Sequence, residues 1–295
     1  MPLLDKLREQ YGVGPLCSEL HIAPSTYYHC QQQRHHPDKR SARAQRDDWL
    51  KKEIQRVYDE NHKVYGVRKV WRQLLREGIR VARCTVARLM AVMGLAGVLR
   101  GKKVRTTISR KAVVAGDRVN RQFVAERPDQ LWVADFTYVS TWQGFVYVAF
   151  IIDVFAGYIV GWRVSSSMET TFVLDALEQA LWARRPSGTV HHSDKGSQYV
   201  SLAYTQRLKE AGLLASTGST GDSYDNAMAE SINGLYKAEV IHRKSWKNRA
   251  EVELATLTWV DWYNNRRLLE RLGHTPPAEA EKAYYASIGN DDLAA

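Results

Sequence analysis

Three carboxylates are spaced along the second half of the chain in a way that suits binding of divalent cations. Asp135 lies inside the apolar stretch LWVADFTYV, Asp194 ends a short apolar run in VHHSDKGSQY, and Glu230 lies in AMAESINGLYK. Between the two aspartates there are 58 residues, and between Asp194 and Glu230 there are 35. A carboxylate inside an apolar strand is costly unless it is paired or binds a cation. Hard divalent cations prefer such oxygen ligands, and two of them about 4 Å apart promote in-line displacement at phosphorus.

Each of these acids also has an ordinary structural explanation. Asp194 is followed by Lys-Gly-Ser, which is typical turn chemistry. A position on a solvent-facing side explains Asp135 less well, because Val133 and Thr137 share its side of the strand. Another acid, Asp153, comes just before a turn, and its position favours strand-end capping over catalysis.

The segments that must position the three acids predict a mixed α/β domain. Runs of Val, Ile and aromatic residues predict strands at 129–140, 144–155 and 157–164. Further along, the pattern predicts helices at 168–185, 202–211, 227–239 and 249–263, and short strands at 189–193 and 214–216. Glu230 and Lys237 are seven residues apart on one predicted helix and therefore share a face. We assign residues 122–285 to this domain and 286–295 to a tail.

The first part of the chain has a different character, because it is strongly basic. The net charge of the chain is +10, but residues 1–120 hold 25 Lys and Arg against 11 Asp and Glu. The stretch 61–111 contains fourteen basic residues and one acid, Glu77. This charge favours a polyanionic partner over a merely solvated basic face.

Helices connected by short turns are predicted in this basic part. Residues 1–45 form a helical segment with two short helices in 11–30, the second capped by Ser25, followed by a polar connector to Asp48. A helix at 49–60 then precedes helices at 67–76 and 82–93 in a helix-turn-helix pattern, which gives a DNA-binding domain at 46–100. Residues 101–121 read as a basic linker suited to a phosphate backbone.

Seven sequence stretches extend this pattern to a known family. They are IAPSTYYH, YGVRKVWRQL, LWVADFTYVS, IIDVFAGYIVGWRV, HHSDKGSQYVS, STGDSYDNAMAESINGLYK and WVDWYNNRRLLERLGHTPPAE. Together with the three acids and Lys237, they resemble the DDE transposases of the insertion-sequence-three family, specifically the second-frame (OrfB) product. The resemblance implies an RNase H-like, retroviral-integrase-type mixed sheet, preceded by an all-α region of helix-turn-helix type.

The resemblance also implies a reaction, a cofactor and partners. Asp135, Asp194 and Glu230 would be the catalytic metal ligands for two Mg²⁺ or Mn²⁺ ions, in an enzyme that cuts element ends and joins the freed 3′-hydroxyl to target DNA. The expected partners are double-stranded DNA, further copies of the chain and the first-frame (OrfA) product. The candidate DNA contacts are Arg68, Lys69, Arg72, Arg83 and Arg88 in the helical region, Lys102, Lys103 and Arg105 in the linker, and Lys195, Tyr224, Asn226, Lys237 and Arg266 near the acids. For each of these, solvated surface or local capping is the alternative.

Composition and competing functions narrow the interpretation. The three cysteines form no CxxC pair, so neither a disulfide framework nor a cysteine zinc site is indicated. No apolar run is long enough to cross a bilayer and the N-terminus has no signal segment, so we expect a cytoplasmic protein without membrane partners. A DNA-binding regulator with an idle catalytic core would leave Asp135 unexplained. A nuclease acting on RNA–DNA hybrids would leave the helix-turn-helix pattern unexplained.

Overall fold

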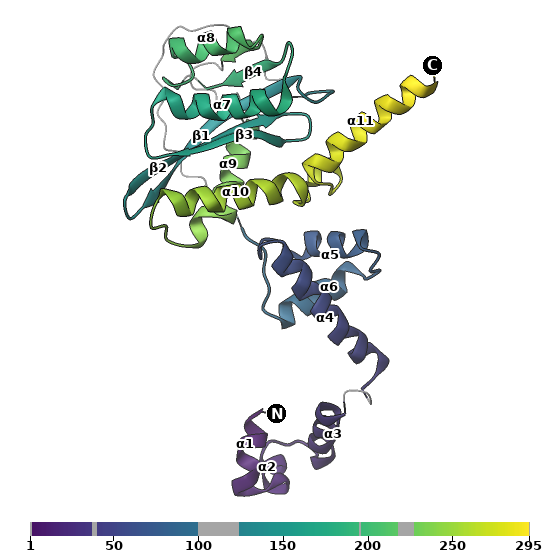
Figure 1. Ribbon diagram of the computed structural model, residues 1–295. Helices are drawn as coiled ribbons and strands as arrows, with labels where there is room; N and C mark the ends of the chain where they lie inside the picture. Colours follow the sequence, from purple (N-terminus) through teal and green to yellow (C-terminus); the bar gives the residue numbers. More distant parts are fainter. Residues whose placement is uncertain (1, 37–39, 100–123, 195, 218–226, 295) are drawn as a thin grey trace.

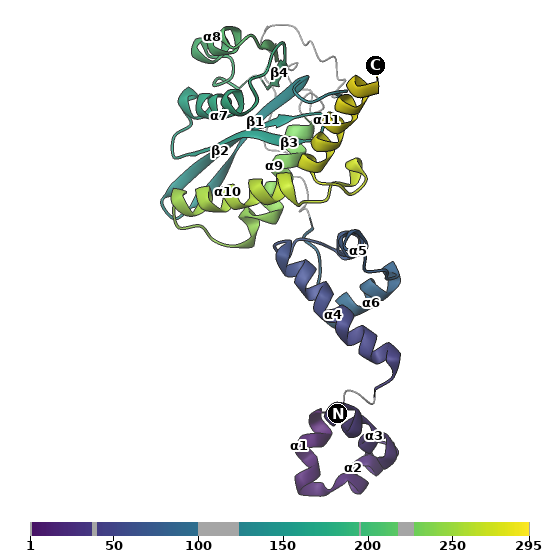
Figure 2. The same cartoon turned by 45° about the vertical axis from the view of Figure 1, so that its right-hand side comes forward.

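A five-stranded sheet with helices on both faces forms the larger part of the structure (Figures 1 and 2). This computed structural model describes residues 2–36, 40–99, 124–194, 196–217 and 227–294. The strands are β1 (Leu131–Thr141), β2 (Gly144–Asp153), β3 (Tyr158–Ser165), β4 (Val190–Ser193) and β5 (Leu214–Thr217). Their order is β3-β2-β1-β4-β5, in which β1, β2 and β3 pair antiparallel, β4 pairs parallel with β1, and β5 pairs parallel with β4. The mixed sheet predicted from the sequence is therefore confirmed.

The two faces of the sheet are buried by different helices. These helices are α7 (Thr170–Arg184), α8 (Leu202–Glu210), α9 (Ala227–Glu239), α10 (Arg249–Asn265) and α11 (Pro277–Ala294), with 3-10 turns η2 (Ile241–Arg243) and η3 (Glu270–Leu272). Because side chains alternate along a strand, Trp132 and Ala134 enter the core that contains α7 and α8. Val133 packs instead in the core that contains α9 and α10. An acid on either face of β1 therefore stands next to a helix layer.

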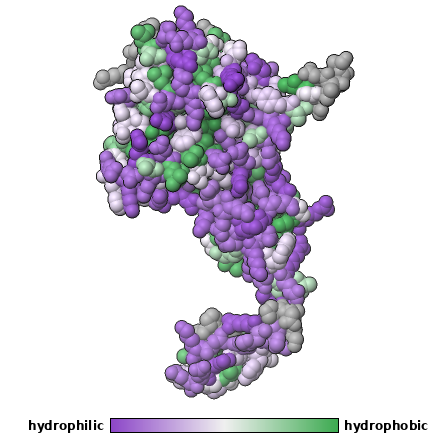
Figure 3. Space-filling model, viewed as in Figure 1, coloured by the Kyte–Doolittle hydropathy of each residue, from purple (hydrophilic) through white to green (hydrophobic). Residues whose placement is uncertain are grey.

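Two helical units precede the sheet domain along the chain (Figures 1 and 2). The helices are α1 (Pro2–Tyr11), α2 (Val13–Glu19), α3 (Pro24–His35), α4 (Ala42–Glu60), α5 (Val67–Arg76) and α6 (Arg83–Val92). The first three surround a small core of Leu4, Cys17 and Tyr27. In the second unit, α5 and α6 form the predicted helix-turn-helix pair, and Val86 and Leu89 are buried as expected. The surface over α4–α6 is mostly hydrophilic (Figure 3).

Buried hydrogen bonds hold the α4–α6 unit against the sheet domain. The hydroxyl of Tyr65 donates to the backbone carbonyl of Arg266 at 3.2 Å and accepts from the backbone N–H of Leu268 at 2.8 Å. The indole of Trp262 donates to Asn61 Oδ1 at 3.1 Å. These side chains lie in the same apolar cluster as α9 and α10, or at its border. The orientation of the helical unit is thus set by directional bonds as well as by packing.

The structure corrects several sequence-based boundaries. Helix α4 begins at Ala42, inside the predicted polar connector, because the Ser41 side chain accepts a hydrogen bond from the N–H of Ala44 at 3.3 Å and caps the helix. Helix α3 begins at Pro24 after Ala23, so Ser25 is not its cap. Helix α11 continues through the predicted tail to Ala294, and helix α1 lies in the predicted helical segment 1–45, where no separate helix had been assigned before residue 11. The basic linker at 101–121 lies outside the described residues, as do Lys102, Lys103 and Arg105. In the part of the chain that is described, no helix has the length and apolar character of a membrane span.

Candidate active site

The first two acids meet where strand β4 ends beside β1. Strand β4 pairs with β1 only from Leu131 to Ala134, so residues 135–141 of β1 face no described strand on that side. We call this segment the open edge of β1. Asp135 is its first residue, and Asp194 directly follows the last residue of β4. Strand pairing alone therefore brings two residues that are far apart in sequence to the same place.

Asp194 is held by the turn that follows it. Its Oδ1 accepts a hydrogen bond from the backbone N–H of Gly196 at 2.9 Å. A Cβ atom at position 196 would lie 2.9 Å from this same oxygen, so a side chain there would displace the carboxylate. Burial raises the pKa of Asp194, while the Gly196 hydrogen bond and His192 act in the opposite direction. Asp194 is thus both a turn residue and a carboxylate held at the end of a strand.

Asp135 is the most perturbed of the three acids. Its Oδ2 accepts from Asn233 Nδ2 at 2.8 Å, and its Oδ1 accepts from the backbone N–H of Phe136 at 2.8 Å. Burial and then the negative charges of Asp194 and Glu230 raise the pKa of Asp135 to about 7, against the hydrogen bonds from Asn233 and Phe136, which lower it. The charges of Asp194 and Glu230 therefore both act on Asp135, although the three acids come from three different elements.

One face of helix α9 supplies the remaining groups of the site. Glu230 lies in the first turn and is exposed, and Asn233 and Lys237 follow at three and seven residues. Burial lowers the pKa of Lys237 and the charge of Asp135 opposes that effect, so the ammonium lies near this carboxylate. The Lys237 Nζ also lies 5.1 Å from the centre of the Tyr138 ring. At the other end of the helix, Glu239 is buried against Arg267, which removes it from the set of available acids.

Asn233 is a site residue that sequence reasoning missed. Its amide fixes one oxygen of Asp135, and its own buried Oδ1 has no hydrogen-bond partner among the described residues. The buried hydroxyl of Tyr199 is likewise without a described partner. Burial raises the pKa of Tyr199, and the charges of Tyr204, Asp135 and Asp194 act in the same direction. The available signal for Asn233 was its place one turn after Glu230, on the same helix face.

The carboxylates and the unpaired amide oxygen are the donor types that hard divalent cations prefer. The repulsion at Asp135 is also of the kind that a cation relieves. In the described chain, however, no group of three or more His, Cys, Asp or Glu side chains is close enough to hold an ion. The donor set therefore fits such a cation in its chemistry, while the described side chains are not gathered around one point.

Asp153 has the structural role that its sequence position predicted. It is fully buried at the end of β2, and its carboxylate accepts from the backbone N–H groups of Asp129 at 2.6 Å and Phe155 at 2.9 Å. These bonds close the start of β1 against the turn after β2. Asp153 therefore caps a strand end and takes no part in the cluster around Asp135.

The basic residues proposed to contact DNA differ in how free they are. Arg83 is exposed at the start of α6. Arg68 forms an ion pair with Glu270 of the sheet domain, and Arg72 packs on the Trp71 ring at 4.7 Å. Lys69 lies over the Tyr65 ring at 5.3 Å, and burial lowers its pKa to about 8.

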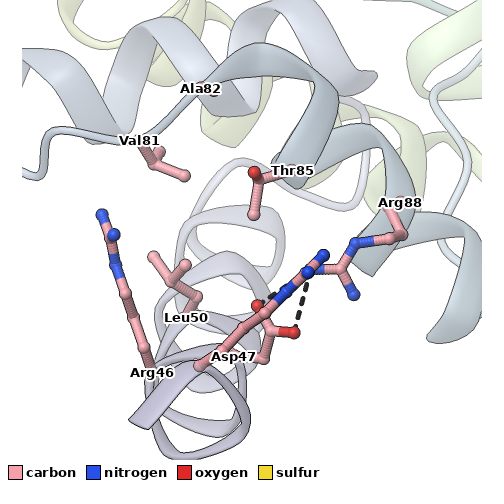
Figure 4. A pocket seen from close by; sticks show the side chains of 8 residues that line it. Arg46, Asp47, Leu50, Val81, Ala82, Thr85 and Arg88 are labelled. Carbon is pink, nitrogen blue, oxygen red and sulfur yellow. Dashed lines mark hydrogen bonds and ion pairs between the residues drawn. The ribbon is translucent and has the colours of Figure 1, made fainter.

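Arg88 lines the rim of a cavity of about 310 Å³ between α4 and α6, together with Arg43 and Arg46 (Figure 4). There its guanidinium donates to both carboxylate oxygens of Asp47 at 2.9 Å. Arg266 was expected near the three acids. The contact found for it is made by its backbone carbonyl, which accepts from the hydroxyl of Tyr65 in the helical unit, and its side-chain contact with DNA stays a prediction. Lys195, Tyr224 and Asn226 lie outside the described residues.

Comparison with known families gives three matches along the chain. The family profile described as an HTH-like domain matches residues 45–103. Two profiles described as integrase core domain match residues 125–223 and 211–277. The first of these covers Asp135 and Asp194, and the second covers Glu230 and Lys237.

Individual proteins agree with these profiles. The chain is 99% identical over 295 residues to the transposase for insertion sequence element IS629 of Shigella sonnei, covering 100% of each chain. It is 54% identical over 273 residues to a putative transposase for insertion sequence element IS986/IS6110 of Mycobacterium tuberculosis, covering 90% of this chain and 96% of that one. Among solved structures, the HTLV-2 integrase catalytic core domain in complex with magnesium is similar at 13% identity and a TM-score of 0.41, over 53% of this chain and 98% of that chain.

Proposed function

Because this chain belongs to the insertion-sequence transposases with an integrase core domain, we propose that Asp135, Asp194 and Glu230 are its catalytic carboxylates. Such an enzyme is a polynucleotidyl transferase that acts in DNA transposition. The observation that carries the assignment is the effect of Asp194 and Glu230 on Asp135, whose pKa both raise. An acid that two other acids repel at an open sheet edge is costly to keep, which is typical of functional sites.

We assign Mg²⁺, or Mn²⁺, as the cofactor, with two ions in the active complex. Asp135, Asp194 and Glu230 would supply the protein oxygen ligands. When bound, the ions activate the nucleophile and stabilise the leaving oxygen of an in-line displacement at phosphorus. Neutralisation by a cation also removes the repulsion that raises the pKa of Asp135.

The side chains around the acids have separate tasks in this proposal. Asn233 donates to Asp135 and keeps that carboxylate turned toward the open edge. Lys237, beside Asp135 and Tyr138, holds a phosphate of the bound strand. In the first step water attacks a phosphodiester at the element end and the 3′-oxygen leaves as a hydroxyl. In the second step this hydroxyl attacks a target phosphodiester and a target 3′-oxygen leaves.

The helical unit α4–α6 binds duplex DNA and brings the element end to the sheet domain. This role rests on the match to an HTH-like domain and on the basic residues 61–111. Pairing and joining two ends requires more than one protomer, so we expect a homo-oligomer on DNA, with the first-frame product as a further candidate partner. Since the substrate is cellular DNA, we expect the reaction to take place in the cytoplasm.

The test compares the chain with its Glu230→Gln variant on labelled element-end duplex, with and without Mg²⁺. Cleavage that requires both Mg²⁺ and Glu230 is the expected result. The matched control is Glu253→Gln, since Glu253 lies on the outer face of α10 and pairs with Arg249. If Glu230→Gln cuts as well as the unchanged chain, the assignment is wrong. If both bind DNA and neither cuts, the same assay with the first-frame product added distinguishes a requirement for that partner from a DNA-binding regulator.

A further inference from the structure

The hairpin between β1 and β2 exposes three large aromatic side chains next to the candidate active site. Tyr138 is 53% exposed, Trp142 is 73% exposed and Phe145 is 57% exposed. Soluble proteins keep few large apolar side chains together on the surface unless they bind something. Fold stability does not require these side chains to be exposed, because the hairpin already pairs through ten backbone positions from Trp132 to Thr141.

Tyr138 and Phe145 form an ordered pair on this hairpin. Their ring centres are 5.6 Å apart and their planes stand at 89°. In the register, Tyr138 faces Tyr147 and Ser140 faces Phe145, so the two rings are diagonal neighbours on one face of the sheet. On that face Phe136 and Tyr147 pack against the core that contains α7, whereas Tyr138 and Phe145 lie outside this core and are exposed.

Lys237 connects this aromatic pair to the catalytic carboxylates. Tyr138 and Asp135 point to opposite faces by strand alternation, yet no described strand covers the open edge of β1 between them. Lys237 therefore reaches past this edge, with its Nζ 5.1 Å from the centre of the Tyr138 ring, while the charge of Asp135 acts on it. One cation thus lies beside both an exposed ring and a candidate metal ligand.

The geometry points to a base-stacking site: an unpaired base of the DNA strand being cut stacks on the face of one ring of the Tyr138–Phe145 pair, while the other ring, perpendicular to it, contacts the edge of the base. Aromatic rings beside a cation are the elements with which proteins bind single-stranded nucleic acid, since every base has a stacking face. The distance from Asp135 to Tyr138 is about 10 Å at ~3.3 Å per residue. Stacked nucleotides rise about 3.4 Å each, so the base lies within about three nucleotides of the cleaved bond. This stacking site rests on the proposed function, because the DNA strand that it binds is the one that the proposed active site cuts.

A nucleic-acid strand fits this surface better than a second copy of the chain. The patch consists of the Tyr138–Phe145 pair and is bordered by Lys237, whose charge complements a phosphate backbone. A second copy would bury this ammonium and would have to bring an acid of its own to the same place, because burying an unpaired charge is costly.

Photo-cross-linking tests the site directly and needs no catalysis. The full chain is bound in EDTA to element-end DNA that carries 5-iododeoxyuridine at one position among the first five from the cleaved end. The expected result is a cross-link to Tyr138 or Phe145, mapped by mass spectrometry, at one or two adjacent positions. Cross-links only to other segments, or equal yields at all five positions, overturn the proposal.

Binding of single-stranded DNA gives a second measure, again without metal. Tyr138→Leu should weaken it by about 5- to 100-fold, from the cost of losing one stacked base. Tyr138→Phe should bind as the unchanged chain does, and so should the control Trp182→Leu, which removes an 81% exposed tryptophan on α7. Thermal melting checks that each variant folds. If Tyr138→Leu changes only the oligomeric state in sedimentation, the patch is a protein interface and the proposal is wrong. Cross-linking at Tyr138 together with normal cutting by Glu230→Gln would preserve this site while contradicting the catalytic assignment.

Discussion

Two acids on neighbouring strands of the sheet, the partly buried Asp135 and the fully buried Asp153, both have a raised pKa but have opposite surroundings. Burial raises both pKa values to about 7. The Asp153 carboxylate accepts hydrogen bonds from two backbone N–H groups and lies at 0% exposure. Asp135 accepts one backbone and one side-chain bond, and it faces Asp194 and Glu230 at the open edge. A shifted pKa alone therefore does not distinguish structure from chemistry.

The difference lies in how each region balances its negative charge. Around Asp153 the neighbouring acids have a protein cation, because Arg184 bonds Glu281 at 2.7 Å and lies 4.0 Å from Asp129. Around Asp135 the nearby cation is Lys237, which stacks on Tyr138 and makes no ion pair with a described acid. The Asp153 region is completed by its own residues. In the Asp135 region, an external cation is needed to neutralise the negative charge of the acids, and a phosphate is needed to neutralise the positive charge of Lys237.

The strongest test of this contrast is Asp135→Asn. Removing one member of a catalytic unit should lower strand cleavage by about 10³-fold or more. Stability at pH 8 should be unchanged or higher, because the substitution removes a repelled buried charge. Gel-based cleavage assays and urea unfolding of the same preparation measure the two effects. A variant that unfolds more easily and cuts normally would make Asp135 a structural acid like Asp153.

The reverse outcome is expected for Asp153→Ala. At pH 5 the substitution should lower the free energy of unfolding by roughly 2–4 kcal/mol, because two buried backbone N–H groups lose their acceptor. Cleavage per folded molecule should be unchanged, since Asp153 does not face the open edge. Urea unfolding monitored by tryptophan fluorescence gives the first value. A stable variant without activity would contradict the division into two regions.

A smaller effect is expected at the residue that orients Asp135. Asn233→Ala removes the amide that donates to Asp135 at 2.8 Å. Loss of a group that orients a metal ligand typically costs about 10- to 100-fold in metal affinity or activity. We therefore expect the Mg²⁺ concentration for half-maximal cleavage to rise by about that factor. Asn265→Ala, at the exposed end of α10, is the matched control, and an equal rise in both variants would exclude a specific role for Asn233.

Much of this contrast could be predicted from sequence because it depends on local pattern. Apolar periodicity predicted the bounds of α9 that the structure shows, and residue composition predicted the positions of β1 and β2. The position of Asp153 before a turn was sufficient to predict its capping role. Each of these features is set by neighbours in sequence.

Features set by distant parts of the chain could not be predicted in this way. The hydrogen bond from Asn233 to Asp135 joins residues 98 positions apart. Arg68 and Arg88 looked like free basic residues, yet acids from other helices, Glu270 and Asp47, pair with them. The early start of α4 at Ala42 was also missed, since its first turns are polar and carry no apolar stripe.

The last prediction concerns pH and uses Asp153 to sharpen the comparison. Its folded-state pKa of about 7 lies above the ordinary value of 3.8, so the folded chain binds the proton more tightly than the unfolded chain. The contribution of this proton is complete below pH 3.8 and is lost as pH rises through 7. The stability gap between the unchanged chain and Asp153→Ala should therefore narrow from pH 5 to pH 8. Asp135 titrates in both proteins and cancels from the difference. A gap that stays constant in urea unfolding would mean that the two N–H donors keep Asp153 ionised throughout, and the two acids would then differ in charge as well as in surroundings.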